Sequence, residues 1–546
     1  MVLGRVSRRA LLVGGWSVLG VPVLAACLGR ESKEKKGGGS AASGGAGSGS
    51  AGASASASGS AGASGGSGQG VTRTVSTVGA TLKVTVGPAV VSNDVMVVPL
   101  AAHLDKAGSS SPSSSGFGLD LVWNGTDRYT GADGVRLVDF DAGTVQETFK
   151  ASSESTLLMD KEPDVTLHAL FKPVDVSTIN VLVPESGLFE GVPVVRDGKL
   201  SEDAKKALED VYDTESSPDP VALETFTASV DGASDTRVTG KSVTITLASD
   251  VLFDSDSADL SAQADTTLKK AADQLSTYPG GQVTIVGHTD DVADDAHNQD
   301  LSQRRAQAVS DRLGQLASMS AYSVSVSGKG ESEPRVPNDS DENRQLNRRV
   351  EITLVPTQES STKSPTGTSK DADKGSGKGG GDLPKAEGPV AKGSEGVTVK
   401  RGGGDDKLTF VLKEVTRRGK YLVGEVKATG GPGGTKTGPA DWLQPTQLAG
   451  SARGEEDTKL LGAITGLSLL TAQTRYYPVD YTTAQGAHHP LSEITADNKL
   501  GDGDATTLTV VWPDTGQDTA TLDLEPSKRP TRPNNPFRLT DIPIKG

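Results

Sequence analysis

The sequence predicts a multidomain protein in which a central α+β domain is flanked by two all-β modules of sandwich-like build. Between residues 237 and 357, apolar stretches with strand and helix periodicity alternate in the order β-α-β-α-β-β, which predicts a mixed sheet covered by helices. Residues 71–195 and 397–546 contain short apolar strands separated by Gly, Asp and Ser, a pattern typical of β-sandwiches. Segments of low complexity separate these regions, which indicates domains joined by linkers.

The composition limits both the size of the packed cores and the classes of partner. The chain has 546 residues, of which only 34% are hydrophobic and 67 are glycine. Much of the length is therefore expected to be linker. The formal net charge of −15 repels nucleic-acid phosphates, so we exclude a general role in nucleic-acid binding.

Residues 1–27 have the basic, apolar and small-residue order of an export signal. Arg8 and Arg9 precede an apolar run in a pattern that resembles a twin-arginine signal. Residues 24–27, Leu-Ala-Ala-Cys, resemble a bacterial lipobox, in which the cysteine is acylated, for example with palmitate, and becomes the mature N-terminus. Cys27 is the single cysteine of the chain, so it cannot form an intramolecular disulfide, and lipidation would explain its presence. The alternative is a short transmembrane anchor, since the run has about 17 residues.

Three further segments connect the domains. Residues 28–70 are almost entirely Gly, Ser and Ala after the first few positions, which predicts a disordered tether. Residues 196–236 form a connector, in which residues 201–212 show helical spacing. Residues 358–396 are rich in Ser, Thr, Gly, Lys and Asp and are predicted to be a second disordered linker.

The two β-rich modules share a weak pattern that fits an internal duplication. In each, an apolar strand ends next to a proline, at residues 171–173 and 511–513, and another apolar strand follows. Each module also finishes near a phenylalanine, Phe189 or Phe537, and an apolar-Pro pair. The alternative is two unrelated all-β modules with common strand habits.

Within the central domain, five motifs occur in an order that resembles OmpA-like domains. They are Val-Leu-Phe-Asp at 251–254, Val-Gly-His-Thr-Asp at 286–290, the helix 298–313, Gly-Lys-Gly-Glu at 328–331 and Asn-Arg-Arg-Val-Glu-Ile at 347–352. The helix fits the family pattern N-x2-LS-x2-RA-x2-V-x3-L at every defined position. The resemblance covers about 115 residues and implies non-covalent binding of peptidoglycan through the diaminopimelate residue of its stem peptide.

The family's two ligand-gripping positions carry over to Asp290 and Arg305. Diaminopimelate ends in an ammonium and a carboxylate on one carbon, so its receptor needs an anion and a planar fork close together. A guanidinium can bond both oxygens of a carboxylate, which suits Arg305 to that role. Asn298 lies seven residues earlier on the same helix face, where it can cap the helix or touch the ligand. The alternative reading of Asp290 and Arg305 is a plain salt bridge.

The remaining candidates are supporting or rim positions of the same site. Leu301 is expected in the core and as a floor of the pocket, and Thr289 as a support within the turn. Arg348 and Arg349 point to opposite faces of a strand, so one of them is expected to support Asp290, and the sequence leaves open which. Phe253 and Asp254 are candidates for the pocket rim.

No pattern predicts an enzyme, a metal site or another cofactor. Asp254, Asp256 and Asp259 fail the calcium-loop spacing, His488 and His489 have no cysteine or third histidine near in sequence, and the six histidines are scattered. The leading hypothesis is a lipoprotein of the cell membrane, or of an outer membrane if the cell has one, that holds peptidoglycan from the side facing the cell wall or periplasm. The alternative is an extracytoplasmic scaffold or sensor whose β-rich modules bind a protein or glycan partner.

Overall fold

The computed structural model describes residues 69–109, 123, 131–151, 163–196, 198–209, 211–213, 219–357, 382–401, 406–443, 463–494, 498–526 and 535–546. The predicted export signal with Cys27 and nearly all of the predicted tether lie outside the described residues. So do residues 358–381 of the predicted second linker. In the described part of the chain, no helix combines the length and the apolar character needed to cross a membrane.

The first strand group comprises most of residues 71–196. Its strands are β1 (Val71–Thr77), β2 (Ala80–Val86), β3 (Ala89–Ser92), β4 (Val95–Lys106), β5 (Arg136–Asp139), β6 (Thr144–Gln146), β8 (Asp164–Phe171), β9 (Thr178–Val183) and β10 (Gly187–Arg196). In β2 the alternation of apolar and polar residues buries Leu82 and Val84 and leaves Lys83 exposed, as the period of two predicts. Strands β1, β2, β4 and β8 form an antiparallel run in that order.

The second strand group repeats these pairings. It contains β18 (Val390–Lys392), β19 (Val397–Lys400), β20 (Lys407–Val411), β21 (Val415–Arg418), β22 (Tyr421–Gly430), β23 (Leu467–Leu470), β24 (Thr474–Tyr476), β25 (Asp480–Thr482), β26 (His488–Pro490), β27 (Ala505–Pro513), β28 (Thr519–Leu524) and β29 (Phe537–Lys545). Here β19, β20, β22 and β27 form the antiparallel run. In both groups the last strand also runs parallel to the strand that follows the first two of the antiparallel run, β10 to β3 and β29 to β21.

Both groups share this order of pairings, and the internal duplication remains a prediction. Each group has its own apolar core, and a third apolar cluster joins them, with Phe140 and Leu182 from the first group and Tyr421 and Val511 from the second. Strand pairings link both groups into one continuous network, so the pairings alone do not divide them into two separate sandwiches. The two sandwich-like modules expected for these regions remain a prediction.

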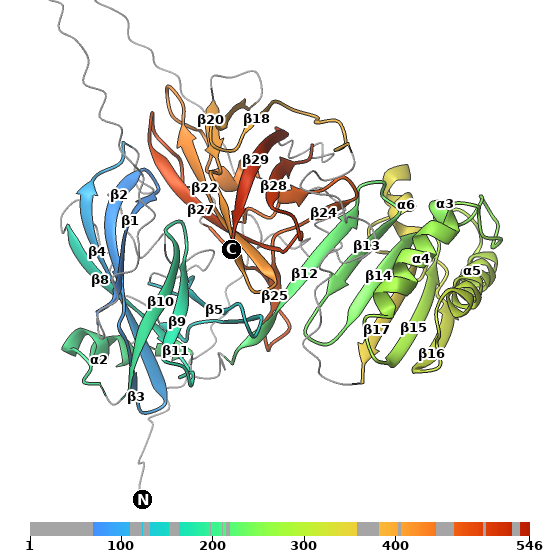
Figure 1. Cartoon of the computed structure of the whole chain (residues 1–546), viewed down its shortest axis with the longest axis horizontal. Helices are drawn as coiled ribbons and strands as arrows, with labels where there is room; N and C mark the ends of the chain where they lie inside the picture. The colour runs from blue at the N-terminus through green and yellow to red at the C-terminus, as the bar shows by residue number, and fades with distance from the viewer. Residues whose placement is uncertain are drawn as a thin grey trace, which may run out of the picture. The chain divides into compact units, whose positions relative to one another are not determined.

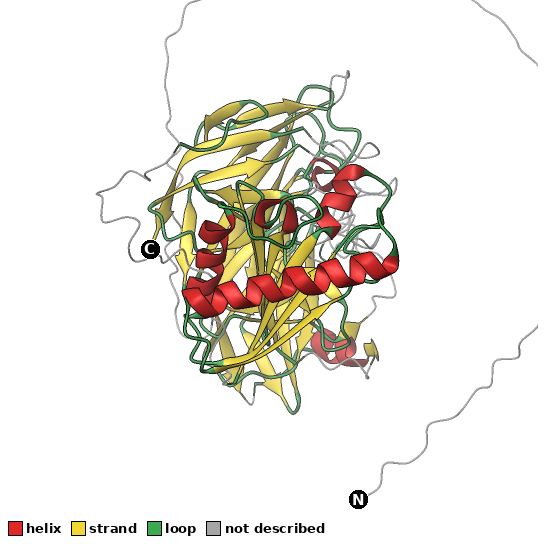
Figure 2. Cartoon of the chain, turned by 90° about the vertical axis from the view of Figure 1, so that its right-hand side faces the viewer, coloured by secondary structure: helices red, strands yellow, loops and turns green. Residues whose placement is uncertain are grey.

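The central domain is a mixed sheet with helices on one face (Figures 1 and 2). Its elements are β14 (Val243–Ala248), α3 (Ser249–Leu252), α4 (Ala264–Leu275), β15 (Gly281–His288), α5 (Asp295–Leu316), β16 (Tyr322–Gly328), α6 (Asp341–Asn347) and β17 (Arg349–Pro356). Strand β17 lies antiparallel between β14 and β15, and β16 runs parallel to β15. The short helix α6, which separates the last two strands, was not predicted, because its residues show no apolar periodicity.

The sheet of the central domain extends beyond its predicted start at residue 237. Strand β13 (Ser234–Val238) pairs with β14, and β12 (Val221–Ser229) pairs with β13. Strand β12 also pairs with β6 of the first strand group and with β24 and β25 of the second. Part of the predicted connector is thus a strand shared by all three regions.

Two other predicted boundaries differ from the observed elements. Helix α2 (Glu202–Glu209) lies inside the stretch predicted as helical, and β11 (Val211–Asp213) follows it and pairs with β7 (Lys150–Ala151). Strand β18 lies inside the range predicted as a disordered linker and pairs with β29. A strand of three residues is too short to give a recognisable sequence pattern. Strand β18 is defined only by its pairing with a distant strand.

Candidate functional site

Helix α5 packs closely on strand β15, so that Arg305 on the helix and Asp290 after the strand lie near enough for their charges to interact. Asp290 follows the end of β15, and Arg305 lies in the middle of α5. Gly287 makes the close approach possible, since a Cβ at this position would clash with the backbone carbonyl of Ser302 on α5. Asp294 is the N-cap of α5, and its side chain accepts a hydrogen bond from the backbone N–H of His297 at 2.9 Å.

The carboxylate of Asp290 is held by a second arginine. Asp290 is only 8% exposed, and its Oδ2 accepts a hydrogen bond from Nη1 of Arg348 at 2.6 Å. Among the described residues, its Oδ1 accepts only a long bond of 3.4 Å, from the backbone N–H of Val292. The Nε and Nη2 of Arg348 donate to the two carboxylate oxygens of Asp250 at 2.8 and 2.7 Å. The hydrogen bond to Asp250 and the one to Asp290 both raise the pKa of Arg348.

Arg305 is anchored by backbone carbonyls rather than by a carboxylate. It is 4% exposed; its Nε donates to the carbonyl of Ser257 at 2.8 Å, and its Nη2 donates to that of Asp254 at 3.4 Å. Its guanidinium also lies over the ring of Phe253, 5.2 Å from the ring centre. Burial lowers the pKa of Arg305, and the negative charges of Asp250 and Asp256 oppose that shift.

Asp290 and Arg305 do not form an ion pair with each other in the described structure. The plain salt bridge considered as an alternative is therefore absent. One edge of the Arg305 guanidinium, Nε with Nη2, faces the two carbonyls. Among the described residues Nη1 has no acceptor, so the edge formed by Nη1 and Nη2 can receive a planar anion.

The other predicted site residues surround these two charges. Asn298 is buried, and its Nδ2 donates to the carbonyl of Asp290 at 3.1 Å and to the carboxylate of Glu331 at 2.6 Å. It therefore fixes the turn that carries Asp290, and the expectation that it caps α5 is wrong, because Asp294 does so. Leu301 and Thr289 are buried.

The structure distinguishes the two adjacent arginines. Arg348 contacts Asp290, whereas Arg349 donates to the carboxylate of Glu351 at 2.7 Å and to the carbonyl of Glu333 at 3.2 Å. Asp250, the second partner of Arg348, was not predicted from the sequence. Asp250 precedes the first recognisable motif and lies on the four-residue helix α3, so no pattern marks it.

His288, next to the site, is expected to make the central domain sensitive to acid. It is 2% exposed, neither ring nitrogen has a hydrogen-bond partner among the described residues, and burial and the cation of Arg349 lower its pKa to about 4. Because the pKa of this histidine is lower in the folded state, the unfolded state takes up the proton first as the pH falls. The stability of the fold is therefore fully present above the unfolded pKa of about 6.5. That stability is lost as the pH falls toward 4.

We expect the loss to approach about 3 kcal/mol at pH 4, the value that corresponds to the depressed pKa. Urea unfolding between pH 7 and pH 4 measures it, and the variant His288→Phe should show a shallower pH profile because it cannot take up the proton. Parallel profiles for the two proteins would contradict the assignment.

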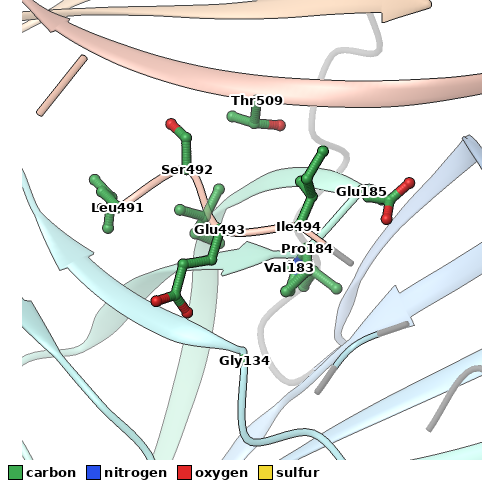
Figure 3. A pocket seen from close by; sticks show the side chains of 10 residues that line it. Gly134, Val183, Pro184, Glu185, Leu491, Ser492, Glu493, Ile494 and Thr509 are labelled. Carbon is green, nitrogen blue, oxygen red and sulfur yellow. The ribbon is translucent and has the colours of Figure 1, made fainter. Parts of the chain in front are cut away.

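A small hollow between the two strand groups is a poorer candidate for a site. Figure 3 shows its lining, which comes from the end of β9, residues 491–494 and β27. The two carboxylates of the lining already accept hydrogen bonds from the protein, Glu185 from Asn498 and Thr506, and Glu493 from His489. In the described part of the chain, no group of three His, Cys, Asp or Glu side chains could hold a metal ion.

Comparison with known proteins places the likeness in the central domain. The OmpA family matches residues 252–348. Outer membrane porin F of Pseudomonas aeruginosa is 42% identical over 102 residues, which are 19% of this chain and 29% of the porin. Probable lipoprotein YiaD of Escherichia coli (strain K12) is 36% identical over 125 residues, 23% of this chain and 56% of YiaD. The chain thus spans less than two thirds of these curated relatives.

Among solved structures, the cell wall anchor of the T6SS from Pseudomonas aeruginosa is 33% identical. The match covers 23% of this chain and 88% of that one, with a TM-score of 0.21.

Proposed function

Residues 252–348 belong to the OmpA family, and from this we propose that the chain binds peptidoglycan non-covalently through the diaminopimelate residue of the stem peptide. The observation that carries the proposal is the pair of buried, opposite charges that do not neutralise each other. Asp290 is held by Arg348 and Arg305 by two carbonyls. Two charges held apart in this way match a ligand that carries an ammonium and a carboxylate on one carbon.

Each charge has a distinct role in this proposal. The Oδ1 of Asp290, which accepts one long hydrogen bond from the described part of the chain, receives the ammonium. The Nη1 and Nη2 of Arg305 donate to the two oxygens of the ligand carboxylate, because the Nε side of the guanidinium faces backbone carbonyls. The ring of Phe253 packs against the guanidinium of Arg305, and the backbone carbonyl of Asp254 accepts a hydrogen bond from it. Both residues therefore position Arg305 and do not contact the ligand through polar side-chain groups.

The proposal gives the protein a structural role in the cell envelope and no catalytic one. A lipid on Cys27 would hold the chain to a membrane, and the segment 28–70 would let the folded part reach the wall. The name of one relative, a probable lipoprotein, fits this arrangement.

Co-sedimentation with purified cell-wall sacculi tests the proposal. We expect the soluble chain that starts after Cys27 to sediment with sacculi whose stem peptides contain diaminopimelate. It should stay in solution with sacculi that carry lysine at the same position, because lysine lacks the carboxylate that Arg305 would bind. The bound fraction should decrease as salt rises, since both contacts are electrostatic. Equal sedimentation with both kinds of sacculi would refute recognition of diaminopimelate.

A further inference from the structure

A chain of three alternating charges lies behind the ammonium end of the proposed site. Arg348 binds both oxygens of Asp250 through Nε and Nη2, and it reaches Asp290 only through Nη1. The side chains of Asp250 and Arg348 are 37% and 29% exposed, whereas that of Asp290 is 11% exposed. The two outer carboxylates thus share one guanidinium, and the more buried of them is the ligand-binding candidate.

The charge balance of this chain depends on Asp250. Arg348 and Asp290 alone would form a neutral pair with little attraction for a cation. With Asp250 present, the three groups carry a net charge of −1. Arg344, a further cation near Asp290, binds the carboxylate of Asp291 at 2.7 Å and the carbonyl of Asn338 at 2.7 Å, so its donors are directed elsewhere.

The hydrogen-bond geometry leads to the same conclusion. Because Asp250 occupies the two-nitrogen edge of Arg348, only a single donor, Nη1, is directed at Oδ2 of Asp290. The other oxygen, Oδ1, accepts only the 3.4 Å bond from the backbone of Val292 within the ranges that the structure describes. If Asp250 did not hold this edge, the same guanidinium could turn and engage both oxygens of Asp290.

We propose that Asp250 is a positioning and specificity-determining residue, which neutralises Arg348 and so keeps the charge of Asp290 available for the ammonium of the ligand. This inference rests on the proposed function, because it concerns the same site. Asp250 does not touch the ligand; it acts through Arg348. Its effect should therefore depend on whether the ligand carries the ammonium.

Calorimetric titration of the soluble chain with three synthetic stem tripeptides tests this role. One ends in diaminopimelate, one in lysine, which lacks the carboxylate, and one in 2-aminopimelate, which keeps the carboxylate but lacks the ammonium. We expect Asp250→Asn to weaken binding of the diaminopimelate peptide about tenfold, as loss of one unit charge near a partly solvated site predicts. Binding of the 2-aminopimelate peptide should not weaken, because this peptide lacks the ammonium and loss of a negative charge does not disfavour its carboxylate.

A matched control and a rescue variant sharpen the test. Asp265 binds Nε and Nη2 of Arg312 at 2.7 and 2.8 Å in the same two-oxygen geometry, but neither residue contacts Asp290 or Arg305. Asp265→Asn should therefore leave all three affinities unchanged. Adding Arg348→Gln to Asp250→Asn removes the cation that would neutralise Asp290, so it should restore most of the lost affinity. A residue with a merely structural role would not be rescued in this way.

Each possible result is decisive. If the unchanged chain binds the diaminopimelate peptide and Asp250→Asn binds it equally well, the role of Asp250 is wrong and the proposed function stands. The role is also wrong if Asp250→Asn weakens both carboxylate-bearing peptides equally, or if the double variant binds no better than Asp250→Asn. If the unchanged chain does not bind the diaminopimelate peptide, the proposed function and the inference both fail.

Discussion

Replacement of Arg305 by alanine is expected to reduce the affinity for a diaminopimelate-containing peptide by about a hundredfold or more. Truncation of one member of a buried, hydrogen-bonded charge pair costs about 2–5 kcal/mol, partly because the other charge is left without a partner. Here the other charge is the ligand carboxylate, which would be desolvated opposite an empty space. Calorimetric titration measures the loss. The affinity of Arg305→Lys should lie between those of the unchanged protein and Arg305→Ala, since lysine keeps the charge but lacks the two-nitrogen edge.

The neighbouring arginine on the same helix is the control for this substitution. Arg304 forms an exposed ion pair with Asp300 at 2.7 Å, one turn away on α5. Arg304→Ala removes the same side chain from an adjacent position, and we expect it to leave the affinity unchanged. Thermal unfolding of both variants separates loss of the site from loss of the fold, because Arg305 also binds the carbonyls of Ser257 and Asp254. Equal affinities for the Arg304 and Arg305 variants would contradict the proposed site.

The largest expected effect on stability comes from Arg136, between the two strand groups. Arg136 is 4% exposed; it donates to the hydroxyl of Tyr481 at 2.8 Å and lies 3.4 Å from both Glu147 and Glu493. Burial alone would lower the pKa of Arg136, but these facing groups raise it. Arg136→Leu removes the cation and leaves two partly buried carboxylates opposite an apolar side chain, so we expect a loss of about 3–5 kcal/mol in the free energy of unfolding.

Arg418 provides a matched control for Arg136. Its guanidinium pairs with Glu190, so it also links the two strand groups, but both side chains are more than one third exposed. Arg418→Leu should therefore cost only about 0–1 kcal/mol. Chemical unfolding of the two variants compares the same substitution in a buried and in an exposed ion pair. Similar small losses for both would show that the Arg136 cluster adds little to the stability of the interface.

The elements and residues with a local signature could be predicted from the sequence. The spacing of Asn298, Leu301, Arg305 and Val309 on one helix face defines α5, and the positions of Asp290 and Arg305 follow from the strand and helix that carry them. The alternation in β2 and in the strands of the central sheet is equally local, since one face of each strand is buried.

The features that escaped prediction depend on contacts between distant residues. Arg348 is the C-cap of α6 and Arg349 is the first residue of β17, so the two arginines do not alternate within one strand as expected, and the pairing of β17 with β14 and β15 decides which of them lies beside Asp290. Asp250 is 98 positions away from its partner Arg348. Two partners of β12, the strands β24 and β25, lie more than two hundred residues further along the chain, and nothing in the nine residues of β12 specifies them.

Strand β12 has a practical consequence for anyone who wishes to study the central domain alone. A fragment that begins at residue 237 lacks most of β13, including Asp235, whose carboxylate forms a largely buried ion pair with Arg335 at 2.9 Å. It would also expose the backbone donors and acceptors along one side of β14, and an exposed strand edge of this kind promotes aggregation. A fragment that begins before β12 keeps the pair but uncovers the side of β12 that now meets β24 and β25. Expression trials should therefore begin with the intact polypeptide, or with charged substitutions on whichever border strand the truncation leaves bare.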